Sequence, residues 1–181
     1  MIVALLGVPG SGKSVIARRL HDEHGFGRVR FGDPLRDMLR AGFQLTDEEI
    51  DGDASRHGQA RFGGCTPHHM IVTLANQWAR ASVHTNLLCT EWRRRVDRLG
   101  GLILTDDLQR ANEAEAVRDA GGIVVRVTRP GYRPMDNNSL ARQSAIHSDI
   151  EIVNHKVDDL NSQTDRIVSI IRTAVGKRDA A

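Results

Sequence analysis

The segment Gly7-Val-Pro-Gly-Ser-Gly-Lys-Ser14 constrains the fold more than any other part of the chain. It matches the pattern G-x-x-x-x-G-K-[ST] at every position, it follows the apolar run Ile2–Leu6, and a helical pattern begins at Lys13. Glycines let the backbone curl so that several N–H groups point at one anion. The pattern therefore predicts a strand, a phosphate-binding loop and a helix in succession. A tight strand-to-helix turn without a ligand is the alternative.

Each residue type in this loop suits a nucleoside triphosphate. We expect Lys13 to place its charge at the β- and γ-phosphates of ATP, and Ser14 to offer its hydroxyl to Mg²⁺. The residues expected around the phosphates are Gly7, Pro9, Gly10, Ser11, Gly12, Lys13 and Ser14. The loop thus predicts ATP and Mg²⁺ as cofactors.

Apolar runs alternate with helical patterns along the rest of the chain, as in sheets of parallel strands covered on both faces by helices. Further strands are predicted at 28–31, 101–105, 123–127 and 150–153, and helices at 13–24, 34–42, 66–81, 88–99, 112–120 and 157–175. In the helix at 66–81, Met70, Leu74, Trp78 and Ala81 are expected on one face. A length of 181 residues favours one domain over 1–181, a doubly wound α/β fold with about five parallel strands. Two polar segments, about 51–65 and about 129–143, are expected to form a flap and a lid-like segment.

Charge and cysteine spacing narrow the classes of protein that the chain could belong to. The net charge of +2 does not by itself indicate a nucleic-acid partner, and the two cysteines lack the spacing of a disulfide framework or a zinc site. The apolar run at the start is too short for a membrane span and has no signal-peptide flanks. We therefore expect a cytoplasmic protein without a membrane partner, in the host cytoplasm if the chain is viral. The sequence leaves open whether the protein is a homodimer.

Three aspartates follow predicted strands. Asp106 and Asp107 stand where a carboxylate would support the metal, partly through water, although they could simply begin a polar turn. Asp33 follows the strand at 28–31 and could orient an acceptor hydroxyl or take its proton. Because Pro34 comes next, Asp33 is also predicted as the N-cap of a helix. Asn112 with Glu115 is predicted to cap another helix.

Arginines are frequent in two parts of the chain. Arg129 and Arg133 belong to the lid-like segment, and we expect one of them to stabilise negative charge on a transferring phosphoryl group. The arginines between positions 93 and 98 fit the solvated face of a helix. His68 and His69 are adjacent and lack the spacing of paired metal ligands, so no metal is assigned to them.

Taken together, GVPGSGKS, FGDPLRDML, GGCTPHHMIVTLANQWARASVH, TDDLQRANEAEAVRDAGGIVVRVTRPG and DIEIVN resemble the deoxynucleoside monophosphate kinases of bacteriophages. The resemblance runs from Ile2 to about Val175. It implies a P-loop kinase fold, ATP, Mg²⁺ and a deoxynucleotide acceptor. It also implies Asn154 near the adenine, and residues in the acceptor region at Asp33, Arg36, Thr66, Trp78, Asp107 and Gln109.

The chain departs from that family's pattern at positions that could contact an acceptor. Gln109 and His68 stand where the family usually has arginine, and 137–140 lacks an acidic residue. Glutamine does not grip a phosphate in the bidentate way of arginine. Related phage kinases phosphorylate 5-hydroxymethyluracil within DNA during thymidine hypermodification, so two acceptors are predicted: a free deoxynucleoside monophosphate, or that base in duplex DNA. A nucleotide-dependent switch or ATPase is the alternative from another class.

Overall fold

The computed structural model describes residues 1–132, 142–155, 160–165 and 168–169. The chain divides into two compact units, of which one combines Met1–Arg30 with Arg95–Ala181 and the other is Phe31–Arg94. The single domain over 1–181 stays a prediction. No helix in the described ranges is both long and apolar enough to cross a membrane.

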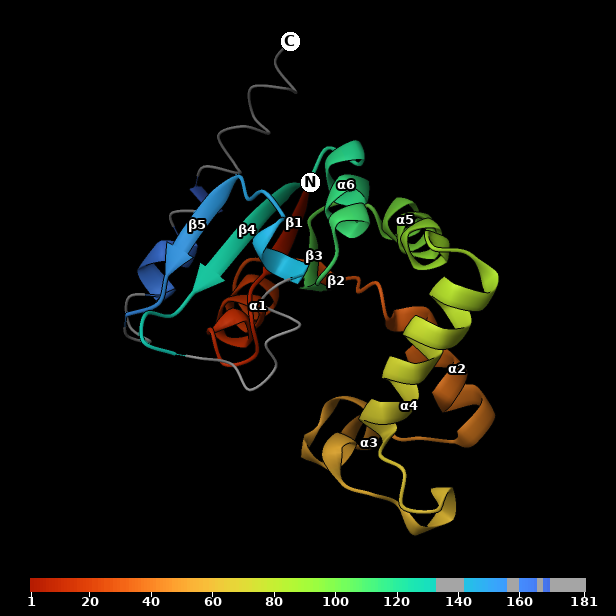
Figure 1. Cartoon of the computed structure of the whole chain (residues 1–181). Coiled ribbons are helices and arrows are strands. Elements are labelled where there is room, and N and C mark those ends of the chain that lie inside the picture. The colour runs from red at the N-terminus through yellow and green to blue at the C-terminus, as the bar shows by residue number, and fades with distance from the viewer. Residues whose placement is uncertain (133–141, 156–159, 166–167, 170–181) are drawn as a thin grey trace. The chain divides into compact units, whose positions relative to one another are not determined.

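The first unit is built on five parallel strands (Figure 1). They are β1 (Ile2–Leu6), β2 (Gly27–Arg28), β3 (Ile103–Leu108), β4 (Ile123–Thr128) and β5 (Ile150–Val153), in the spatial order β2-β3-β1-β4-β5. Val3 lies in register with Leu104 on one side and with Ile123 on the other. The predicted doubly wound, five-stranded parallel sheet is confirmed.

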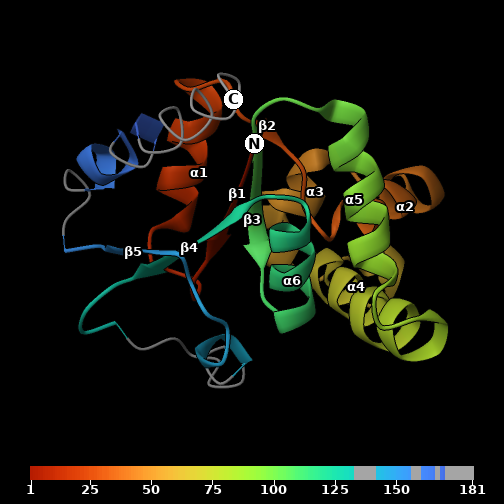
Figure 2. The same ribbon diagram turned by 90° about the horizontal axis from the view of Figure 1, so that it is seen from above.

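Helices cover both faces of this sheet (Figure 2). On one face, α1 (Lys13–Asp22) buries Ile16 and Leu20 against Val3, Leu104 and other strand residues. On the opposite face, α6 (Ala111–Asp119) brings Val117 to Ile2, and both side chains crowd Gly122, where an added Cβ would lie 2.8 Å from each of them. Successive strand residues point to opposite faces, so the all-buried β1 contributes to both layers.

Two strand boundaries differ from the prediction. The strand β2 is shorter than 28–31, and β3 is longer than 101–105 because Leu108 pairs with Leu6 and is buried. Asp106 and Asp107 therefore lie inside β3 instead of after it. The pairing of β3 with β1 is irregular at these two residues, between Thr105 and Leu108.

Two predicted helix N-caps are wrong, one by a single residue and the other by two. The helix α2 (Asp33–Phe43) has Gly32 as its N-cap residue, so Asp33 occupies the first helical position. At α6, the carboxylate of Glu113 accepts hydrogen bonds from the N–H groups of Gln109 and Arg110, at 2.8 and 3.1 Å. Glu113 is almost fully buried and reaches these donors, so this pair takes the place of Asn112 with Glu115.

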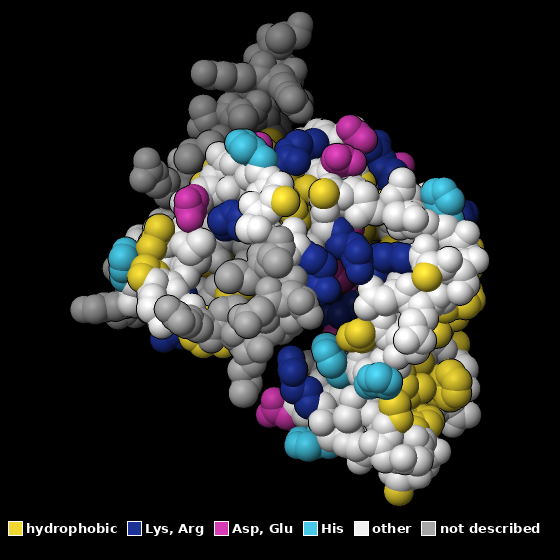
Figure 3. All heavy atoms as spheres, in the orientation of Figure 1, with side chains coloured by type: hydrophobic (Ala, Val, Ile, Leu, Met, Phe, Trp, Pro, Cys, Tyr) yellow, Lys and Arg dark blue, Asp and Glu magenta, His cyan; other side chains and the backbone are white. Residues whose placement is uncertain are grey.

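The second unit consists of short helices around two small apolar clusters. After α2 come α3 (Asp47–Asp51), two 3₁₀ turns (Asp53–Arg56 and Ala60–Phe62), α4 (Pro67–Thr73), a π-helix (Leu74–Val83) and the first part of α5 (Leu87–Leu99). Leu35, Ala79 and Leu88 form one cluster, and Leu39, Leu45 and Ile50 form the other. Hydrophobic side chains also gather on the face in Figure 3 where Figure 1 draws α2 and α4. The expected flap thus contains local helical turns, and its movement stays a prediction.

The residues predicted to share one face of the helix at 66–81 do not share it beyond Leu74. A π-helix has more residues per turn than an α-helix, so the residues that share a face change at that point. Ala79 is fully buried, whereas Trp78 is 42% exposed and Ala81 is exposed. The π-helix turns the tryptophan away from the core.

Most of the expected lid-like segment, at 133–141, lies outside the described residues, as does most of the last predicted helix.

Candidate functional site

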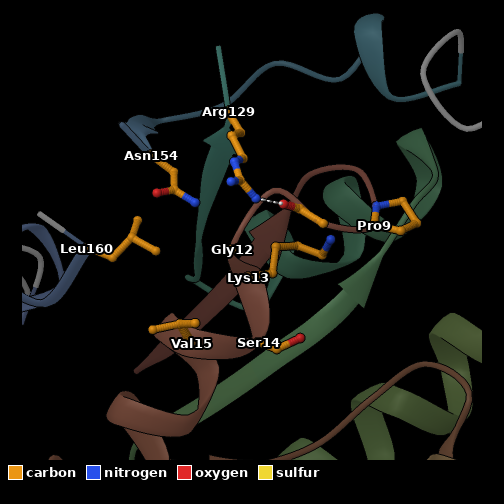
Figure 4. A pocket seen from close by; sticks show the side chains of 9 residues that line it. Pro9, Gly12, Lys13, Ser14, Val15, Arg129, Asn154 and Leu160 are labelled. Carbon is orange, nitrogen blue, oxygen red and sulfur yellow. Dashed lines mark hydrogen bonds between the residues drawn. The ribbon is translucent and has the colours of Figure 1, made fainter. Parts of the chain in front are cut away.

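A cavity of about 300 Å³ opens over the loop that joins β1 to α1 (Figure 4). It lies within the first unit. The residues that line it are Pro9, Gly10, Gly12, Lys13, Ser14, Val15, Arg129, Asn154 and Leu160. The loop predicted to bind phosphates therefore forms one wall, and Arg129 and Asn154, far away in the sequence, form another.

The backbone of the loop is shaped for an anion. Gly10 and Gly12 have φ angles of 83° and 109°, in the left-handed region that favours glycine. Within the described residues, the N–H groups of Gly12, Lys13 and Ser14 donate no hydrogen bond to the backbone or to a side chain. Such donors at the start of a helix suit a phosphate group.

Lys13 is held by the loop itself. Its ammonium group donates hydrogen bonds to the carbonyl oxygens of Gly7 and Val8, the latter at 3.0 Å. Burial lowers the pKa of Lys13 to about 8, although the carboxylate of Asp106 acts in the opposite direction. A phosphate group would supply the negative charge that this buried ammonium group favours.

The two candidate carboxylates on β3 lie where its pairing with β1 is irregular. Ala4 pairs with Thr105 and Leu6 with Leu108, so one more residue lies between the paired positions on β3 than on β1. The Asp106 carboxylate affects the pKa of Lys13 and lies in an ion pair with Arg28. Asp106 is therefore the carboxylate of the pair that acts on the lysine of the loop.

Arg129 and Asn154 both contact the loop. Nη1 of Arg129 donates to the carbonyl oxygen of Gly10 at 3.5 Å, as the dashed line in Figure 4 shows. The buried Nδ2 of Asn154 donates to the carbonyl oxygen of Ser11 at 2.8 Å. An added Cβ on Gly12 would lie 2.6 Å from that Nδ2 atom, so Asn154 in this position leaves no room for a side chain at position 12. Arg133 lies outside the described residues.

Tyr132, Leu160 and Arg28 were not predicted at this site. The ring of Tyr132 lies over the loop, where an added Cβ on Gly10 would be 2.6 Å from its hydroxyl oxygen, and the Arg129 guanidinium lies 5.8 Å from the ring centroid. The sequence carries no pattern that marks these three residues. Tyr132 and Leu160 come to the loop through the tertiary fold, and Arg28 on β2 contacts Asp106 on the neighbouring strand β3.

The predicted acceptor residues Asp33, Arg36, Thr66 and Trp78 all belong to the second unit. Nε of Arg36 donates to Asp51 at 3.1 Å, and its Nη1 lies 3.9 Å from an Asp33 oxygen. The hydroxyl of Thr66 accepts from the N–H of His69 at 3.0 Å and caps α4, as expected for Thr66 before Pro67. The structure thus brings Arg36 together with Asp33.

The environment of His68 favours its uncharged form. Burial lowers the pKa of His68, and the positive charges of Arg56 and Arg36 and the neighbouring His69 lower it further. Gln109, in the first unit, is exposed.

No group of three or more histidine, cysteine, aspartate or glutamate side chains in the described ranges could hold a metal ion by itself. Mg²⁺ is commonly held by one or two protein oxygens together with water and substrate phosphates. The Ser14 hydroxyl and the Asp106 carboxylate fit that arrangement, because Ser14 lines the cavity beside Lys13 and Asp106 acts on the pKa of the same lysine.

No protein-family model matches the chain. It is 28% identical over 191 residues to a protein of Acanthamoeba polyphaga mimivirus named "Putative deoxynucleotide monophosphate kinase", with 96% of this chain and 97% of the relative covered. Two solved structures are similar. Shikimate kinase from Aquifex aeolicus has a TM-score of 0.50 at 18% identity, over 97% of this chain and 99% of that one. A protein of Chloroflexus aurantiacus described as a "putative kinase" has a TM-score of 0.52 at 11% identity, over 95% and 96%.

The chain has the fold of the P-loop kinases. The similarity to the mimivirus protein also agrees with the predicted resemblance to kinases that act on nucleotides. The narrower part, a bacteriophage subgroup and its modified-base kinases, stays a prediction.

Proposed function

We propose that this protein is an ATP-dependent kinase that transfers a phosphoryl group to a deoxynucleotide. The observation that carries the proposal is the loop at 7–14, whose backbone donors and buried Lys13 form a site for phosphates inside a P-loop kinase fold. The printed name of the mimivirus relative supports a deoxynucleotide acceptor. A nucleotide-dependent switch or ATPase would have no need of that acceptor.

On the donor side, each residue has a separate task. The N–H groups of the loop and Lys13 bind the β- and γ-phosphates, and Ser14 with Asp106 would hold Mg²⁺. When bound, Mg²⁺ would neutralise charge on the phosphates. Arg129, which already contacts the loop, stabilises the charge that develops on the transferring group. Asn154 holds the loop backbone on the side where we expect the adenine.

On the acceptor side, we assign Asp33 and Arg36 to the second substrate. Arg36 would pair with an acceptor phosphate, and Asp33 would orient the attacking oxygen or take its proton. Gly32, and not Asp33, is the N-cap residue of α2, which weakens the view that Asp33 serves only as a cap. Trp78 is exposed and could stack on a base.

Two acceptors follow from this assignment. A free deoxynucleoside monophosphate is favoured by the mimivirus relative. 5-Hydroxymethyluracil in duplex DNA is favoured by Gln109 and His68, because neither residue grips a terminal phosphate as arginine does. In that case the acceptor is an alcohol, and Asp33 acts as its base.

The experiment supplies labelled ATP and Mg²⁺ with no acceptor, with each free deoxynucleoside monophosphate, or with duplex DNA that contains 5-hydroxymethyluracil. We expect label to move to one acceptor class, and the Lys13→Ala variant to transfer none, which excludes a contaminating kinase. Label in free nucleotides alone would exclude the DNA acceptor, and label in DNA alone would exclude the free one. ATP hydrolysis at the same rate with and without every acceptor would contradict a kinase and favour the switch or ATPase.

A further inference from the structure

The carboxylate expected to support the metal is held by an arginine from the neighbouring strand. Nη2 of Arg28 donates to Oδ2 of Asp106 at 2.6 Å, and Nε of Arg28 donates to Oδ1 at 3.1 Å. This is a bidentate pair, in which the planar guanidinium fixes the orientation of the carboxylate as well as its charge. Nothing in the sequence marks Arg28, and the proposed function does not use it.

Arg28 and Lys13 approach Asp106 from opposite sides. In the sheet order β2-β3-β1, Arg28 comes from β2, Asp106 lies on β3, and the loop with Lys13 follows β1. Each carboxylate oxygen has two lone pairs, and the bidentate pair uses one on each oxygen. One lone pair on each oxygen remains for another partner.

Exposure differs sharply within the pair. The side chain of Asp106 is 9% exposed, whereas that of Arg28 is 44% exposed. Arg28 therefore covers the solvent side of the carboxylate. Without it, the attraction between Asp106 and Lys13 would draw the carboxylate toward the lysine, into the space that phosphate and metal need.

We infer that Arg28 is a positioning residue, which keeps the Asp106 carboxylate directed at the magnesium of a bound Mg²⁺–nucleotide and away from Lys13. This inference rests on the proposed function, because it assumes that the loop binds Mg²⁺ with a nucleotide. Outer partners that orient a ligating carboxylate typically change metal affinity by about 10- to 100-fold when they are removed.

The chain offers a matched control in the same unit. Nε and Nη2 of Arg19 donate to the two oxygens of Asp165, each at 3.0 Å, and so form a second bidentate pair. Asp106 acts on the pKa of Lys13, whereas Asp165 is not among the groups that do so. Arg19→Gln therefore removes a bidentate ion pair whose carboxylate does not act on the lysine of the loop.

The test measures ATP binding by titration calorimetry at a series of Mg²⁺ concentrations for the wild type, Arg28→Gln, Arg28→Lys and Arg19→Gln. We expect the Mg²⁺ concentration at half-maximal binding to rise about 10-fold or more in Arg28→Gln. Arg28→Lys keeps the charge but not the bidentate geometry, so its Mg²⁺ concentration at half-maximal binding is expected to rise less. Arg19→Gln should match the wild type.

Thermal unfolding of each variant shows whether it is folded at the temperature of the titration. A folded Arg28→Gln variant with the wild-type Mg²⁺ midpoint would overturn the inference while leaving the proposed function intact. A lower midpoint would also overturn it, because Arg28 would then compete with the metal. If the wild type binds no ATP at any Mg²⁺ concentration, the proposed function and the inference both fail.

Discussion

At the scale of single residues, the positive charge of Lys13 lies in a buried environment that disfavours it. Lys13 is buried against carbonyl oxygens, and its pKa is about 8, well below the value of a lysine in water. A phosphate in the cavity would favour the charged form and raise that pKa again. Nucleotide binding is therefore expected to be coupled to proton uptake by this side chain.

This coupling predicts how ATP affinity depends on pH. Below about pH 8 Lys13 is charged in the free protein, so affinity is nearly constant. Above that pH a proton must be taken up when ATP binds, so the affinity should fall by up to about tenfold per pH unit. This decrease should end where the pH reaches the raised pKa of Lys13 in the bound state. Calorimetry from about pH 7 to about pH 9.5, in buffers of different ionisation enthalpy, measures both the affinity and the proton uptake.

Lys13→Arg provides the comparison, because arginine stays charged throughout this range. Its affinity, even if weaker overall, should not change with pH. A wild-type affinity that stays constant above pH 8, without proton uptake, would show that Lys13 does not bind the phosphates.

At the scale of elements, the π-helix at Leu74–Val83 decides which side chains enter the core. α4 begins as its cap predicts, with Thr66 bonded to the N–H of His69. From Leu74 onward the change in residues per turn buries Ala79 beside Leu35 and Leu88 and exposes Trp78. π-helical segments are rare and often occur at functional sites. The exposed tryptophan is thus available to a ligand.

The two helical registers predict opposite effects of mutation on stability. With the π-helix, Trp78→Ala should change the free energy of unfolding by no more than about 0.5 kcal/mol, because the side chain is already partly solvated. Ala79→Leu should cost about 1–3 kcal/mol, because the site is fully packed. Urea unfolding of both variants measures these changes.

A continuous α-helix with Trp78 inward would reverse this order. Trp78→Ala would then be the more destabilising change. If Trp78 also contacts the acceptor, Trp78→Ala should raise the KM for the acceptor while the protein remains as stable as the wild type.

At the scale of the whole molecule, the two units have separate apolar cores and separate proposed tasks. The cavity and Lys13 belong to the first unit, and Asp33 and Arg36 belong to the second. The second unit is held by the small clusters of Leu35 and Leu39 and their neighbours. Each unit can therefore be weakened without direct damage to the other.

Leu39→Ala tests this separation. Leu39 is fully buried beside Leu45 and Ile50, so its truncation should cost about 2–5 kcal/mol. Hydrogen exchange should increase within Phe31–Arg94, and phosphoryl transfer should fall, while ATP binding at the loop persists.

Leu20→Ala is the matched change in the first unit, where Leu20 of α1 packs against strand residues such as Val3 and Leu104. It should weaken ATP binding as well as transfer. Loss of ATP binding in Leu39→Ala to the same extent as in Leu20→Ala would contradict independent units.

The sequence alone predicted the features that depend on neighbouring residues. The loop at 7–14 and the alternation of strands and helices follow from local backbone and side-chain chemistry, and the structure contains both, although β2 is shorter than predicted. The caps at Asp33 and Asn112 were wrong because the N-cap at Gly32 uses no side-chain bond, and because Glu113 reaches back to two N–H groups. A single sequence does not reveal which of several nearby polar residues will accept the hydrogen bonds of the first N–H groups of a helix.

Only the tertiary structure decided what lies around the loop. Parallel strands that are distant in the sequence become neighbours in the sheet, and this order brings Arg28 to Asp106 and Asn154 to Ser11. It also brings Asp106 close enough to Lys13 to act on the pKa of that lysine. The sequence by itself determined a phosphate-binding loop, because that depends on eight consecutive residues. The surroundings of the loop depend on long-range strand order, which no local pattern contains.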